Sequence, residues 1–133
     1  MFLLHLAPAE RRVFAGLARY LTAADGREGA AEAAALHQLE VELGMPLEEV
    51  EAMAPTPELL GTFASRSSRG AALLELLALA YADGVPHPDE MELLKTIAAG
   101  LQISELRLLE MEHWVVQQLP LNATAHAFLS EDE

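Results

Sequence analysis

The sequence contains no cysteine, few aromatic residues and few basic residues. The absence of cysteine excludes disulfide bonds, thiolate metal sites and catalysis by a thiol. Eight Lys and Arg residues against 21 Asp and Glu residues give a formal net charge of −13. Such an excess of negative charge repels nucleic acid and anionic membranes and favours cations or basic partners. We therefore expect no nucleic-acid partner for this chain.

Signals for membrane targeting and for common catalytic chemistries are also missing. The apolar start, Met1–Pro8, is too short and too uncharged for a signal peptide, and no apolar run is long enough to cross a bilayer. The sequence has no phosphate-binding glycine loop and no nucleophile elbow, and no pair of its histidines has zinc spacing. We expect a soluble, cytoplasmic protein that does not insert into membranes and is not an enzyme.

What the sequence has in abundance is helix-forming residues. Apolar residues make up 52% of the chain, many of them Ala and Leu, and no strand pattern competes with the helical periodicity. A chain of 133 residues fits one compact domain. The sequence therefore predicts an all-α fold, a compact bundle of about seven helices in a single domain spanning residues 1–133.

One short motif occurs twice at a constant offset. Ala24-Asp25-Gly26 recurs 58 residues later as Ala82-Asp83-Gly84. The same offset relates Glu32 to Glu90, Leu36 to Leu94, Leu43 to Leu101 and Met53 to Met111. This pattern predicts two pseudo-symmetric helical repeats, about 8–55 and 69–118, with a connecting helix at about 56–65 and a flexible acidic tail at 121–133.

The helix boundaries follow from caps and breakers. We expect helices from Pro8 to Asp25-Gly26, from about Ala30 to Leu43, after Pro46, from Thr56-Pro57, over about 70–82, from His87-Pro88, and from Ser104 to about Gln118 before Pro120. The polar stretch Ser65–Ser68 is either a loop or a helix end. The segment 70–82 carries only one charge, Glu75, before its closing Asp-Gly turn, so it is expected to form the buried central helix. Glu75 is expected to pair with an arginine or to reach the edge of the core.

Two aspartates stand where the helix macrodipole disfavours them. Asp25 and Asp83 each close a helix at its negative end, which costs about 0.3–1 kcal/mol for an exposed carboxylate. The repetition of this unfavourable choice suggests that something compensates. The aspartate could accept hydrogen bonds from the N–H groups that open the next helix, or it could bind a cation.

Two glutamates follow the aspartates in the first turn of the next helix. Glu32 and Glu90 would lie near Asp25 and Asp83 once each hairpin closes, and together they form an all-oxygen set suited to calcium or magnesium. His87 could add a nitrogen ligand or could simply be a turn residue. The glutamates also occupy the third helical position, where a glutamate caps the helix in any protein. Both interpretations stay open, and a tight metal site would need both hairpins or a partner's ligands.

The two Ala-Asp-Gly units and their glutamates resemble the TerB-like family, small acidic proteins named after tellurite resistance. The resemblance runs from about Leu6 to Gln118 and includes Tyr20–Gly26 and Leu79–Gly84. It implies an all-helical fold of two pseudo-symmetric halves, suspected metal-binding positions at Asp25, Glu32, Asp83 and Glu90, and a link to stress response without enzymatic activity. The sequence departs from the family at Arg27–Ala31, where many relatives have an isoleucine and a serine or threonine cap. Because tellurite is an anion, any role in tellurite resistance would be indirect.

Three functions follow from these observations. The first is a non-enzymatic TerB-like protein that binds a divalent cation through the duplicated loops and acts through a protein partner. The alternative is a metal-free interaction module whose acidic residues only cap helices, with the apolar segment Phe2–Leu6 helping to form a partner or dimer surface. The third is a metal-dependent hydrolase, which would require an open coordination site.

Overall fold

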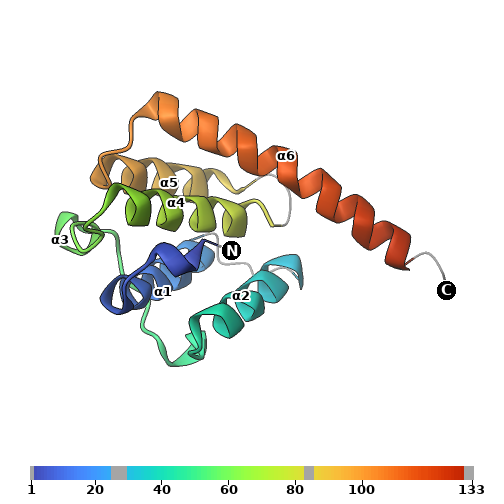
Figure 1. Ribbon diagram of the computed structural model, residues 1–133, viewed down its shortest axis with the longest axis horizontal. Coiled ribbons are helices and arrows are strands. Elements are labelled where there is room, and N and C mark those ends of the chain that lie inside the picture. Colours follow the sequence, from blue (N-terminus) through green and yellow to red (C-terminus); the bar gives the residue numbers. More distant parts are fainter. Residues whose placement is uncertain (1, 25–29, 83–85, 131–133) are drawn as a thin grey trace.

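The computed structural model describes residues 2–24, 30–82 and 86–130, without the side chains of residues 30–32 and 119–130. Within these residues the chain forms six α-helices and two short 3-10 helices (Figure 1), which confirms the all-α class. The elements are η1 (Leu3–His5), α1 (Pro8–Ala23), α2 (Ala30–Leu43), η2 (Leu47–Glu49), α3 (Pro57–Leu60), α4 (Arg66–Ala80), α5 (Pro88–Gly100) and α6 (Glu105–Ser130). The segment after Pro46, expected as a helix, is the 3-10 turn η2.

Helix α4 is the centre of the fold. It packs against α1, α2, α5, α6 and η1, and Leu73, Leu76 and Leu77 are fully buried. These neighbours cover most of its apolar surface and leave an exposed edge at Ser67 and Ala78, so the prediction of a buried central helix is confirmed. Its start lies earlier than predicted, because the polar stretch before it is a cap. The Ser65 hydroxyl accepts the Ser68 N–H at 3.0 Å, and the Ser68 hydroxyl accepts the Ser65 N–H at 3.2 Å.

The other helices surround α4 on opposite sides. Figure 1 shows α4 and α5 side by side, with α6 lying along them on one side and with α1 and α2 on the other. The C-terminal part of α6 extends away from the body of the protein (Figure 1). No helix in the described part of the chain has both the length and the hydropathy needed to cross a bilayer.

Helix α6 is longer than the sequence predicts. Ser104 caps it as expected, its hydroxyl accepting the Arg107 N–H at 3.1 Å. The predicted end at Gln118 is wrong, since the helix continues through Pro120 to Ser130. A proline inside a helix removes one N–H donor, but the bonds before and after it can still form. Residues 121–130 are therefore helical rather than part of a tail, and residues 131–133 lie outside the description.

The N-terminal segment packs into the core. Leu3 and Leu6 are buried in the main apolar cluster, and the Phe2 ring meets the Trp114 ring of α6 edge-to-face with centroids 5.9 Å apart. The segment is also tied to α4 by a hydrogen bond of 3.1 Å between His5 Nδ1 and the Ser67 hydroxyl. Leu3 and Leu6 are therefore unavailable to a partner, whereas Leu4 is 87% exposed, and the expectation that this segment helps to form a partner or dimer surface stays a prediction.

Helices α2 and α5 are each followed by a residue in the left-handed conformation. Gly44 follows α2 with φ of 71°, and Gln102 follows the C-cap of α5 with φ of 62°. Glycine adopts this conformation without a steric penalty, whereas a residue with a Cβ incurs one. The fold therefore carries local strain at Gln102 that it lacks at Gly44.

Replacing Gln102 by glycine should stabilise the protein. We expect Gln102→Gly to raise the free energy of unfolding by about 1 kcal/mol, because it removes a Cβ from a left-handed residue. Gly44→Ala, which introduces the same strain, should lower it by a similar amount. Urea unfolding followed by circular dichroism measures both effects. A Gln102→Gly protein no more stable than the wild type would contradict this account.

Candidate functional site

The structure describes one of the four predicted metal ligands in full. Asp25 and Asp83 lie outside the described residues, and Glu32 belongs to α2 but its side chain is outside the description. Glu90 is the exception, placed in the first turn of α5. A cation site formed by all four residues therefore stays a prediction.

Glu90 caps the helix that it opens. It is buried, with 3% of its surface exposed, and its Oε1 accepts the backbone N–H of His87 at 3.2 Å. The His87 Nδ1 accepts the backbone N–H of Asp89 at 3.1 Å. These bonds satisfy N–H groups that a helix start otherwise leaves without partners. The sequence allows Glu90 either to cap its helix or to bind a cation, and the structure shows the capping hydrogen bond at the start of α5.

The described side chains do not form a metal centre on their own. Among residues 2–24, 33–82 and 86–118, no three His, Asp or Glu side chains lie close enough together to hold a metal ion. A site at the Asp-Gly hairpins would depend on residues beyond these ranges.

A second buried carboxylate, Glu10, joins two separate parts of the fold. Its Oε1 accepts the Ala7 N–H at 2.7 Å, and its Oε2 accepts the Ala64 N–H at 2.9 Å. Burial raises the pKa of Glu10, but these two hydrogen bonds, with a contribution from the Ser68 hydroxyl, outweigh it and leave the pKa below its ordinary value. The sequence marks Glu10 only as a favourable first-turn acid. Its partner Ala64 is 54 residues away, so no local sequence pattern indicates this bond.

The third buried carboxylate, Glu75, holds the N-terminal segment. It lies on the central helix, with 7% of its surface exposed, and its Oε1 accepts the Phe2 N–H at 2.7 Å. A carboxylate in an apolar environment needs such donors to offset the loss of water. Glu75 therefore fixes η1 against α4, an arrangement typical of a structural residue.

Glu112 of α6 is the described acid whose pKa is shifted upward. Burial raises the pKa of Glu112, and the positive charge of Lys95 on α5 opposes this effect. Burial and the charge of Glu112 together raise the pKa of Tyr81, which follows α4. These three groups lie where α4, α5 and α6 meet, and they connect α6 electrostatically to the body of the protein.

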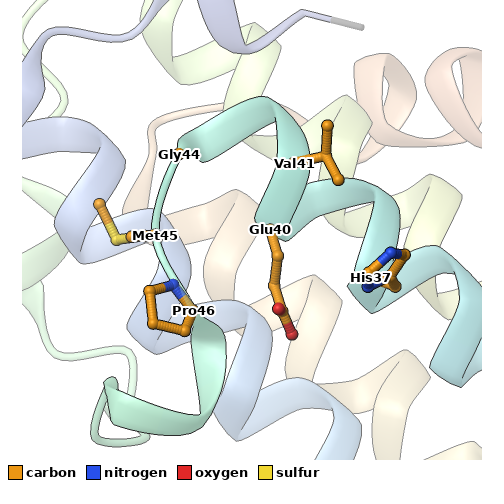
Figure 2. Close-up of a pocket in the computed structure, with 6 residues that line it drawn as sticks. All are labelled: His37, Glu40, Val41, Gly44, Met45 and Pro46. Atoms are coloured by element: carbon orange, nitrogen blue, oxygen red, sulfur yellow. The ribbon is translucent and has the colours of Figure 1, made fainter.

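A shallow hollow lies at the end of α2. It has a volume of about 280 Å³ and is lined by His37, Glu40, Val41, Gly44, Met45 and Pro46. Figure 2 shows Glu40 extending from one side of α2 and Val41 from the other, with His37 one turn earlier. The hollow is open to solvent and mostly apolar, so it does not provide the water-excluding environment that catalysis by a carboxylate and an imidazole needs.

Exposed apolar side chains gather on α6. Seven large apolar residues are exposed among the described residues, and Leu106, Leu109, Trp114 and Val116 are four of them. The opposite side of the helix carries Leu108 and Val115, which are buried in the core. Helix α6 is thus apolar on two faces, and only one of them is covered. The prediction from the sequence does not include this face, although apolar residues stand on more than one side of the helix that begins after Ser104.

Comparisons with known proteins add no assignment. No family model, no curated protein and no solved structure gives a significant match to this chain.

The lowered pKa of Glu10 predicts a pH-dependent contribution to stability. Because the folded-state pKa lies below the ordinary value of 4.5, the stabilisation is present above that value and is lost as the pH falls through the folded-state pKa. Glu10→Gln should therefore destabilise the protein most near neutral pH and least in acid. Urea unfolding of both proteins from about pH 3 to pH 7 measures the difference, and a difference independent of pH would contradict the prediction.

The cation hypothesis makes a separate prediction. If the Asp-Gly hairpins bind calcium or magnesium, millimolar cation should raise the melting temperature, because a ligand that binds only the folded state stabilises it. Asp25→Asn combined with Asp83→Asn should abolish that rise. Calorimetric titration with each metal ion measures the binding directly. A melting temperature that does not respond to either cation would leave helix capping as the role of these carboxylates.

Proposed function

We propose that this chain is a non-enzymatic protein-interaction module, and that it binds its partner through the outer face of α6. The outer face is defined by Leu106, Leu109, His113 and Val116, which follow one another at spacings of three, four and three residues. Residues at these spacings lie on one side of a helix. The observation that carries the proposal is the exposure of the three apolar members, 71% for Leu106, 60% for Leu109 and 42% for Val116. Contiguous exposed apolar side chains are typical of protein–protein contact sites.

The use of the buried carboxylates supports a role without catalysis. Glu10, Glu75 and Glu90 each accept a hydrogen bond from a backbone N–H, which fixes the start of a helix or a neighbouring segment. Carboxylates engaged in this way contribute to the fold. This observation favours the metal-free version of the interaction module at α5, whereas cation binding at the hairpins remains a proposal carried by the sequence alone.

We also propose that the fold is a duplicated helical unit. Helices α1 and α4 begin at residues 8 and 66, and α2 and α5 begin at residues 30 and 88, so both pairs are offset by 58 residues. The two left-handed residues, Gly44 and Gln102, have the same offset. These matches support the repeat suggested by the two Asp-Gly units. A relation to TerB-like proteins and a link to stress response rest on the sequence resemblance.

Site-specific crosslinking tests the outer face. We expect p-benzoylphenylalanine in place of Leu109 to form covalent adducts with a partner when the protein is irradiated in cells of its natural host, because this side chain projects from the exposed face. The same amino acid in place of Val41 is the control, since Val41 is 67% exposed but lies on α2.

The outcome depends on a comparison between the two positions. Adducts at position 109 that are absent at position 41 support the proposal. No adduct at position 109, or the same adducts at both positions, would overturn it. Circular dichroism of both variants checks that their helix content is that of the wild type.

A further inference from the structure

We propose that the partner of the outer face is an amphipathic helix with an apolar seam and basic flanks, which packs along α6 as in a two-stranded coiled coil. This inference rests on the proposed function and specifies the partner. It is drawn from the heptad spacing of the outer face and from the charges beside it.

The outer face has the spacing of a coiled-coil seam. Leu106 and His113 are seven residues apart, as are Leu109 and Val116, so the four residues alternate as a and d positions over two heptads. Apolar side chains fill three of the four positions. The buried residues Leu108 and Val115 are also seven residues apart, on the opposite side of the same helix. The heptad pattern of the outer face is therefore separate from the pattern that packs α6 onto the core.

Acidic residues flank this seam on both sides. Glu105 and Glu112 occupy the g positions, and Glu110 and Gln117 occupy the e positions. Three of the four flanking residues are thus glutamates. Glu105 and Glu110 are exposed, whereas Glu112 is half-buried and interacts with Lys95 of α5. In coiled coils the residues at e and g select the partner through ion pairs between helices. Lysine or arginine at the corresponding positions of a partner helix would complement this face, and the net charge of −13 would attract such a helix over longer distances.

The same charges disfavour a second copy of this chain as the occupant. In a parallel pair, Glu105 of one copy would face Glu110 of the other. In an antiparallel pair that matches the whole seam, with Leu106 opposite Val116, Glu110 of one copy would face Glu110 of the other. Like charges at these positions repel, so self-association would place two glutamates opposite each other in either orientation. A basic helix from another protein avoids this repulsion.

Binding to a pair of model peptides tests the inference. Two fluorescein-labelled helical peptides of about three heptads would share leucine at a and d and differ only at e and g, with lysine in one and glutamate in the other. Fluorescence anisotropy with the full chain at low salt gives the affinities. We expect the lysine peptide to bind at least about tenfold more tightly than the glutamate peptide.

Variants of the outer face separate the seam from its flanks. Leu106→Ser with Leu109→Ser should weaken binding of the lysine peptide by about tenfold or more, because the seam loses its apolar contacts. Glu105→Lys with Glu110→Lys should lower the affinity for the lysine peptide and raise the affinity for the glutamate peptide. The preference between the two peptides would then be reversed.

Two matched controls distinguish effects specific to the outer face from the effect of total charge and from the loss of any exposed apolar side chain. Glu49→Lys with Glu51→Lys changes the net charge by the same amount at exposed positions away from α6, and Val41→Ser removes an exposed apolar side chain from α2. Neither control should change the peptide preference. Circular dichroism confirms that each variant is folded.

Each result decides the inference. Equal binding of the two peptides overturns it. The inference is also overturned if Glu105→Lys with Glu110→Lys and the control Glu49→Lys with Glu51→Lys lose the same amount of binding to the lysine peptide, because the total charge alone would then account for the attraction. Dimerisation of the chain that requires Leu106 and Leu109, seen by analytical ultracentrifugation, would also overturn it. Crosslinked adducts at position 109 without a peptide preference would leave the proposed function standing and remove only this account of the partner.

Discussion

The fold depends on the burial of most of the surface of α4 by its neighbours. Complete burial of a leucine side chain contributes about 1.5–3 kcal/mol, and Leu73, Leu76 and Leu77 are all fully buried. A helix with apolar side chains all round cannot be stable beside water, so α1, α5, α6 and the N-terminal segment must cover it together. The one carboxylate in this environment, Glu75, gains a backbone donor from Phe2. The packing of the central helix and the docking of the N-terminus are thus parts of the same constraint.

The strong negative charge of the chain is divided between two roles. Glu10 and Glu90 are buried and accept backbone N–H groups at helix starts, where the helix dipole favours a negative charge. Glu105 and Glu110 are exposed on α6 and remain available to a partner. An excess of acidic residues in a sequence therefore gives no direct measure of a binding surface, because part of the excess maintains the helix termini.

Helix α6 contributes both to the packed core and to the exposed surface of the molecule. One side of it completes the core through Leu108 and Val115, and it is linked to α5 by the charges of Glu112 and Lys95. The other side presents apolar residues to solvent. A helix that is fixed along one face offers a pre-organised surface on the other, and such a surface binds a partner helix without the entropic cost of ordering itself.

The sequence by itself determined the helical class, the burial of α4 and most helix starts, because the cap at Thr56, the proline at Pro8 and the apolar periodicity are local signals. It did not determine which carboxylate meets which donor. The bonds from Glu10 to Ala64 and from Glu75 to Phe2 join residues far apart in the chain, and no local pattern encodes them. The exposure of the second apolar face of α6 was likewise decided by the tertiary structure, since only packing decides which side of a helix is covered.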